Sequence, residues 1–426
     1  MTAATPPEPA PATIGARLAD FFRSLRDFDR SFWAANVSEL FERISYYGMK
    51  AFLVLFLMNG LGVSEVEAGD IGGWFGLSVW GLAAVSGFLA DIIGYRRAML
   101  LAYTLLGGAY FLLGWVTGGV PTILALVLVA FGTSLIKPSI TGTVQKTCSA
   151  GQRALGFSIY YTLVNIGGAL GPKLAGWIRT EWKETGSAVA LSVSAASIVV
   201  ALLLILFLFK EPPNEGGAER KRFSDFLRDF RTVLSNWRFV LLVLLVGLYF
   251  CVFWQLYYGL QFYAVKVLQL DDSTIGGLVA IESVSVVCLQ VVVGYLVRNL
   301  KPMWATFAAA ALSAASMLGI GLGLPIGLMI FVLALGEIIY SAHFYKYLGS
   351  IAPPNQVGLY MGFAFLPIGL GDFFGGMLAG RLFTWSNDVL KAPEVMWYVF
   401  AGVGMVAAVG MLLLARGGEQ KAPSGS

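Results

Sequence analysis

A succession of long apolar segments is the feature that most restricts the fold of this chain. A helix needs roughly 20 mostly apolar residues to cross a bilayer, and the sequence offers about twelve such stretches: 33–58, 70–92, 97–118, 120–142, 154–178, 187–209, 238–266, 273–298, 303–321, 324–349, 357–382 and 394–415. Within lipid, only helices and closed barrels satisfy their own backbone polar groups. The sequence therefore predicts an all-α integral membrane protein.

Composition supports this class and argues against several others. Charged residues make up 13% of the chain, whereas soluble domains carry about 25%. The 51 glycines are scattered and form no phosphate-binding loop. The cysteines Cys148, Cys251 and Cys288 lack the spacing of a metal site or a disulfide. We therefore expect no enzyme activity, no cofactor, no bound metal and no nucleic-acid partner.

The charges outside the apolar segments predict an orientation. Basic residues precede the first segment and recur in alternate connections, at Arg17, Arg23, Arg26, Arg30, Arg96, Arg97, Arg220, Lys221, Arg222, Arg298, Lys301, Arg416 and Lys421. The intervening connections are acidic, with Glu65, Glu67, Asp70, Asp271 and Asp272. By the positive-inside rule both termini face the cytoplasm, and we expect a multi-pass protein of a bacterial inner membrane.

One long polar connection, residues 211–236, divides the segments six and six. We predict a cytoplasmic N-terminal segment (1–32), two six-helix bundles (33–210 and 237–415) and a cytoplasmic tail (416–426). Apolar residues recur at helical spacing in the N-terminal segment and in the connection, at Leu18, Phe21, Phe22 and Leu25 and at Phe223, Phe226, Leu227 and Phe230. They predict amphipathic helices that anchor the chain on the inner leaflet.

Charged residues inside the apolar segments point to a polar cavity. Each costs roughly 2.5–3.5 kcal/mol at mid-bilayer on insertion scales, and the segments contain Glu39, Glu42, Arg43, Lys50, Lys137, Glu282, Glu337, His343 and Asp372. So many charges on different helices must face one another or water. We interpret His343 as a packing residue. Asp372 follows a glycine-rich run that permits close helix packing, and we interpret it as a structural hydrogen-bonding residue.

The first segment concentrates polar residues on one helical face. Glu39, Arg43, Tyr46, Tyr47 and Lys50 follow one another at helical spacing, and Glu39 can pair with Arg43. Two carboxylates beside a cation make a protonation switch physically reasonable, because each charge alters the proton affinity of the others. The alternative is an ion network that only stabilises the bundle.

At these residues the sequence resembles the proton-coupled oligopeptide transporter family, a branch of the major facilitator superfamily. Residues 39–48 match its ExxERFxYYG signature with Ile in place of Phe, and residues 131–138, 160–167 and 336–341 resemble its fourth-helix lysine, FYxxINxG and tenth-helix GExxxS motifs. The resemblance runs from about residue 33 to 382. It implies a major facilitator fold of about twelve helices in two six-helix bundles.

The resemblance also implies site residues. Proton coupling would fall to Glu39, Glu42, Arg43 and Lys137. A substrate pocket would contain Arg43, Tyr46, Tyr47, Lys50, Lys137, Asn165, Trp254, Ser285 and Glu337, in which the cations receive a substrate carboxylate while Asn165 and Glu337 receive an amine. Asp91 and Arg97 match the loop motif of the superfamily and are expected at a cytoplasmic gate, with ordinary loop charges as the alternative.

The sequence departs from the family at the outer gate. Lys50 stands where the family usually has Arg. Tyr258 stands where the family usually has the glutamate of the seventh helix that pairs with this Arg. Counting residues along the helices places Glu282 at a depth similar to that of Lys50. We therefore predict that Lys50 and Glu282 form the gate pair when the protein is closed to the outside. The alternatives are that each faces the water-filled cavity separately or that Lys50 shares a tyrosine.

These observations together predict a secondary transporter. We expect a proton-driven symporter that imports a small peptide or similar zwitterion by alternating access, with the proton gradient as its energy source. Its partners would be a small-molecule substrate, protons and the lipid bilayer; the sequence leaves the oligomeric state open. The alternatives are a proton-antiporting drug or metabolite exporter and, more remotely, a non-transporting membrane receptor.

Overall fold

The computed structural model describes residues 24–115, 118–149, 151–213, 228, 231–351 and 363–419. These ranges are almost entirely helical and contain no β-strand, as predicted. The main helices are α2 (Arg30–Leu61), α3 (Glu65–Ile93), α4 (Tyr95–Trp115), α5 (Gly119–Thr147), α6 (Arg153–Trp182), α7 (Gly186–Leu208), α9 (Trp237–Phe253), α10 (Gly259–Lys266), α11 (Asp272–Val297), α12 (Pro302–Gly321), α13 (Ile326–Ile351), α15 (Leu366–Thr384) and α16 (Val395–Glu419). The two expected amphipathic helices lie largely outside the described residues.

Each of the twelve predicted segments overlaps one of these helices or the consecutive pair α9 and α10. Within the described ranges, eight helical runs are long and apolar enough to cross a membrane, and nine with α3, which bends by 46° near Ala83. The run Arg153–Leu208 counts once among them, although it comprises α6 and α7, which pack against each other. Twelve crossings therefore stay a prediction.

Local signals explain where the helices begin and end near the site. Asp29 caps the start of α2 by accepting from the amide of Ser31, and Gly62 ends it in a left-handed conformation. Ser64 and Glu67 form a capping box at the start of α3. A 3-10 turn, Trp254–Leu256, interrupts the seventh predicted segment between α9 and α10. The interruption places Tyr258 at the break between the two pieces.

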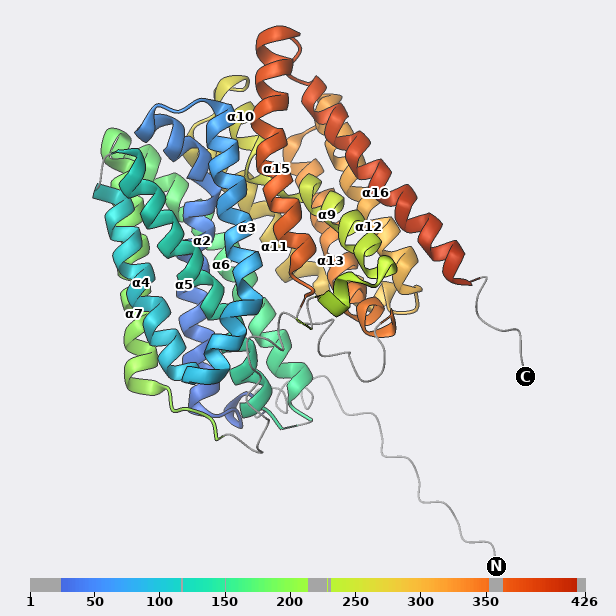
Figure 1. Ribbon diagram of the computed structural model, residues 1–426. Coiled ribbons are helices and arrows are strands. Elements are labelled where there is room, and N and C mark those ends of the chain that lie inside the picture. Colours follow the sequence, from blue (N-terminus) through green and yellow to red (C-terminus); the bar gives the residue numbers. More distant parts are fainter. Residues whose placement is uncertain are drawn as a thin grey trace, which may run out of the picture.

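The helices of the first and second halves of the chain gather on opposite sides of the molecule (Figure 1). In the first half, α2 packs against α6 and α7, and α4 packs against α5 and α7. In the second half, α12 packs against α13 and α16, and α15 packs against α9. Two extensive contacts join the halves: α3 with α15, and α6 with α11.

Glycines allow the contact between α3 and α15. A side chain at Gly69 would meet the backbone of Gly376, and one at Gly73 would meet the backbone of Phe373. The close approach extends to the end of the molecule where α2 ends and α3 begins, because Gly380 lies against the backbone of Glu65. We call this end, at the top of Figure 1, the upper end.

Candidate functional site

The centre of the site is a buried ion cluster on α2. The Nε atom of Arg43 lies 2.5 Å from Oε2 of Glu42 and 3.6 Å from Oε1 of Glu39. The exposed fractions of Glu39, Glu42 and Arg43 are only 1%, 0% and 2%. Among the described residues, one terminal nitrogen of Arg43 and one oxygen of Glu39 are buried without a hydrogen-bond partner. The cluster therefore contains two carboxylates for one guanidinium and has unused hydrogen-bonding capacity.

Neighbouring helices supply neutral partners to this cluster. Tyr160 of α6 donates to Glu39 at 3.3 Å, and Thr133 of α5 donates to Glu42 at 3.4 Å. On α2 itself, the guanidinium of Arg43 lies 5.1 Å from the ring centre of Tyr46 and 5.9 Å from that of Tyr47. The predicted polar face of α2 therefore contacts the core of the molecule, where α5 and α6 complete the environment of the cluster.

Lys137 is the nearest additional cation on α5. Its ammonium lies over the rings of Trp80 and Phe365, at 4.7 Å and 5.0 Å from their centres. Arg43, Glu39, Glu42 and Glu337 all act on it electrostatically, yet it forms no ion pair within the described part of the chain. Lys137 is thus a cation close to the cluster that remains available to a further anion.

A second acidic site lies in the other half of the molecule. Glu337 of α13 accepts from the hydroxyl of Tyr161 at 3.4 Å, and its other oxygen is buried with no partner in the described ranges. Glu282 of α11 acts electrostatically on Glu337 and accepts from Ser283 at 2.6 Å. No ion pair involves either carboxyl group among the described residues. Two buried carboxyl groups thus act on each other in the second half without a cationic partner among the described residues.

The remaining predicted pocket residues differ in whether their polar atoms already have hydrogen-bond partners. The Asn165 amide donates to the backbone oxygen of Tyr161 at 2.9 Å, and the Ser285 hydroxyl donates to that of Ile281 at 2.6 Å. Both side chains therefore already bond their own helices. Trp254 is 3% exposed, and its indole nitrogen has no hydrogen-bond partner in the part of the chain that the structure describes.

The predicted pair of Lys50 with Glu282 is wrong for this conformation. The ammonium of Lys50 lies 2.9 Å from Oδ1 of Asp372 and donates to the hydroxyl of Tyr258 at 2.6 Å. Glu282 lies instead beside Glu337. Depth along a helix did not identify the partner, because α11 packs against α6 and α13 whereas α15 packs against α3 and α9.

Asp372 makes buried hydrogen bonds, as the sequence analysis expected, but its pairing with Lys50 was not predicted. The glycine-rich run around it was a usable signal, because it allows α15 to approach α3 closely enough to bury a carboxylate there. A side chain at Gly76 would collide with the Asp372 carboxyl group, and one at Gly72 would collide with Tyr258. The hydroxyl of Tyr258 lies 2.6 Å from Oδ1 of Asp372 and 2.7 Å from the backbone oxygen of Gly72, and its one proton can be donated to either.

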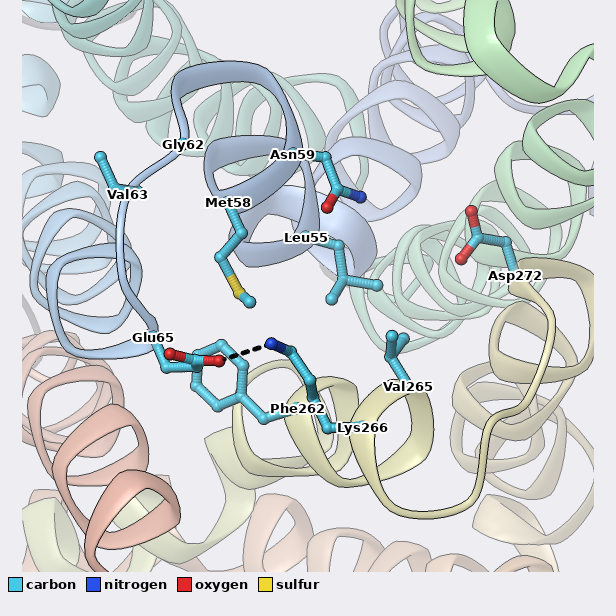
Figure 2. Close-up of a pocket in the computed structure, with 10 residues that line it drawn as sticks. All are labelled: Leu55, Met58, Asn59, Gly62, Val63, Glu65, Phe262, Val265, Lys266 and Asp272. Carbon is cyan, nitrogen blue, oxygen red and sulfur yellow. Dashed lines mark ion pairs between the residues drawn. The ribbon is translucent and has the colours of Figure 1, made fainter. Parts of the chain in front are cut away.

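Three further ion pairs join the two halves at the upper end. Glu65 lies 3.0 Å from Lys266, Arg179 lies 2.8 Å from Asp272, and Asp70 lies 2.5 Å from Arg381. A cavity of about 300 Å³ lies beside them, lined by Leu55, Met58, Asn59, Glu65, Lys266 and Asp272 among others. Figure 2 shows the ammonium of Lys266 directed at Glu65 across this cavity. The upper end is therefore closed by contacts between the halves.

The expected gate at the opposite end is not paired here. Asp91 accepts from the hydroxyl of Tyr95 at 3.1 Å, and the side chain of Arg97 is exposed. No ion pair joins Asp91 and Arg97, both of which the structure describes. Glu211 instead binds the start of α4 by accepting from the amides of Tyr95 and Arg96, at 2.8 Å and 2.7 Å. The gating role of Asp91 and Arg97 stays a prediction.

Comparisons with known proteins agree with this geometry. A family model described as Major Facilitator Superfamily matches residues 37–344. Dipeptide and tripeptide permease A of Citrobacter koseri is 24% identical over 89% of this chain and 90% of its own. Dipeptide and tripeptide permease B of Salmonella typhimurium is 31% identical, over 41% of this chain and 36% of its own. The resemblance recognised in the sequence is confirmed.

Solved structures share the fold. The crystal structure of a peptide transporter of the oligopeptide transporter family in complex with sulfate superposes with a TM-score of 0.77 at 19% identity, over 91% of this chain and 94% of its own. A transporter of the same family in complex with 5-aminolevulinic acid also gives 0.77, at 17% identity, over 91% of this chain and 96% of its own. These likenesses establish the major facilitator fold, whereas the twelve helices in two six-helix bundles stay a prediction.

Proposed function

Because this chain belongs to the major facilitator superfamily, we propose that it is a proton-coupled symporter that imports a small peptide or peptide-like zwitterion. The observation that carries the proposal is the buried cluster of Glu39, Glu42 and Arg43, which contains two carboxylates and one cation. Its relatives named as dipeptide and tripeptide permeases support the substrate class.

The cluster would couple proton binding to substrate binding because Arg43 exchanges its carboxylate partner for an anionic group of the substrate. When both carboxylates are charged, they hold Arg43. Protonation of Glu39 or Glu42 weakens this hold and leaves Arg43, together with the unpaired Lys137, able to bind an anionic group of the substrate. A proton drives transport only through such a difference in affinity between states.

The charges suit a zwitterion held between the two halves. Arg43 and Lys137, from the first half, would receive the carboxylate. Glu337, from the second half, has a buried free oxygen and would receive the amine, beside Tyr47 and Tyr161. Charged groups at both ends explain why a ligand with two opposite charges would be bound better than a neutral one.

Alternating access follows from the division into two halves. We propose that residues 33–210 and 237–415 are bundles that rock against each other. The positive-inside pattern makes the upper end the outer one, with both termini in the cytoplasm of a bacterium and the protein in its inner membrane. The closed upper end then corresponds to a state sealed from outside.

Uptake by the purified protein in proteoliposomes tests the proposal. An imposed gradient, acidic outside, should drive accumulation of di- or tripeptides above the external concentration, and an uncoupler should abolish it. Amino acids and hydrophobic drugs serve as comparison substrates. Extrusion of a drug driven by the inward proton gradient would support the antiporter instead, and absence of any flux would support a receptor.

A further inference from the structure

We propose that Glu282 is a specificity-determining residue that binds a second cationic group of the substrate, so that the transporter prefers peptides with a net positive charge. This inference rests on the proposed function, in which a simple zwitterion needs only one carboxyl group, Glu337, for its amine. Glu282 of α11 and Glu337 of α13 act on each other, and neither forms an ion pair among the described residues. One carboxyl group is therefore left over when a simple zwitterion is bound.

The charges in the interior of the molecule show the same imbalance. Within the described residues, the acidic and basic side chains of this region are Glu39, Glu42, Glu282, Glu337 and Asp372 against Arg43, Lys50 and Lys137. Carboxyl groups exceed cations by two, and a proton on the α2 cluster reduces the excess to one. A zwitterion adds equal charges of both signs and leaves this excess, whereas a ligand with one net positive charge cancels it.

Burial gives the excess charge an energetic consequence. Glu282 is only 4% exposed, and a buried carboxylate without a counter-ion is costly in a low-dielectric interior. Its hydrogen-bond donor is Ser283, the next residue on the same helix, at 2.6 Å, and a neutral hydroxyl balances no charge. Oε2 of Glu337 is also buried with no partner in the ranges that the structure describes. A cationic ligand group at each carboxyl group would satisfy both.

Close packing of α11 against α6 brings Glu282 towards the first half of the molecule. A side chain at Gly168 of α6 would meet the hydroxyl of Ser283 and the ring of Tyr47, so the absence of a side chain there lets this turn of α11 approach α2. Lys137 of the first half acts electrostatically on Glu337. The site for a substrate carboxylate and the two carboxyl groups therefore belong to one region.

Aromatic rings surround the two carboxyl groups. Both Glu282 and Glu337 act electrostatically on four tyrosines from different parts of the chain, Tyr47, Tyr161, Tyr249 and Tyr257. The faces of tyrosine rings attract cations such as an ammonium or a guanidinium. These surroundings favour a peptide whose terminal amine binds Glu337 and whose basic side chain binds Glu282.

Two dipeptides that differ by a single charge test the inference. Alanyl-lysine carries one net positive charge at neutral pH, and alanyl-Nε-acetyl-lysine has the same backbone and side-chain stem without it. Calorimetry on the purified full-length protein should show that alanyl-lysine binds at least about tenfold more tightly. Equal or weaker binding of alanyl-lysine by the parent protein would overturn the inference, whatever any variant does.

Variants assign the preference to one carboxyl group. Glu282→Gln should abolish the preference, whereas Glu337→Gln should weaken both peptides because both keep the terminal amine. Ser283→Ala is the matched control, since it removes the neutral donor but leaves the charge of Glu282, and it should retain the preference. A preference that survives Glu282→Gln, or one that Ser283→Ala abolishes, would refute the assignment.

Alanyl-alanine separates this inference from the proposed function. If the protein binds alanyl-alanine but does not prefer alanyl-lysine to its acetylated form, the inference is wrong and the proposed function stands. If it binds none of the three peptides, the proposed function is contradicted and the inference falls with it.

Discussion

The guanidinium of Arg43 binds Glu42, its immediate neighbour in the sequence, at 2.5 Å, while Glu39, one helical turn away, lies at 3.6 Å. Adjacent residues on a helix normally point in different directions, so the long side chain of Arg43 bends back to reach Glu42. The shorter contact makes Glu42 the main counter-ion of Arg43, and protonation there should release the guanidinium most fully.

We predict that Glu42→Gln abolishes proton-driven accumulation but leaves exchange intact. The amide cannot take up or release the proton, so the gradient no longer biases the cycle. Uptake under a pH gradient should reach only the external concentration, while counterflow with preloaded vesicles remains measurable. Glu181→Gln, which changes an exposed carboxylate at the end of α6, is the control and should accumulate normally. Accumulation above equilibrium by Glu42→Gln would contradict this role.

Replacement of Glu337 should reveal a contact with the substrate amine. A hydrogen bond to a charged group contributes about 1.5–3 kcal/mol. Glu337→Gln is therefore expected to weaken binding of a free-amine dipeptide by roughly 10- to 150-fold, and to affect the N-acetylated dipeptide little. Binding is measured by calorimetry on the purified protein. Equal losses for the two ligands would indicate an indirect effect.

A double-mutant cycle should identify the partner of Lys50. Lys50→Gln and Asp372→Asn are expected to be strongly non-additive in their effect on thermal stability, with a coupling of about 0.5–3 kcal/mol. Lys50→Gln and Glu282→Gln should add, because Glu282 lies beside Glu337 instead. Coupling of Lys50 to Glu282 and independence from Asp372 would reverse the assignment.

Gly76→Ala should destabilise the interface of α3 with α15. The added methyl group would overlap the Asp372 carboxyl group, and overpacking of this kind typically costs about 1–3 kcal/mol. Gly81→Ala on the same helix is the control, because its methyl group would meet only the end of Leu77 at 4.0 Å. Thermal unfolding in detergent should show a lower midpoint for Gly76→Ala than for Gly81→Ala. Equal midpoints would mean that the interface accommodates the added methyl group without loss of thermal stability.

The site was partly predictable because some of its relations are local. The Glu39 and Arg43 pair follows from a spacing of four residues on one helix, and helical geometry alone brings such residues together. The positions of the apolar segments follow from the thickness of the bilayer, which sets their length. The sequence by itself therefore determined the helical class, the order of the helices and the cluster on α2.

Only the tertiary structure decided which charges meet across the two halves. Lys50 is 322 positions from Asp372, and residue counting gives depth in the membrane but not the direction in which a helix presents a side chain. Contact depends on the glycines that let α15 lie against α3, and on the break after α9 that turns Tyr258 inward. The packing of α11 against α13 brings Glu282 to Glu337 instead of Lys50, and no residue count along a single helix contains that information.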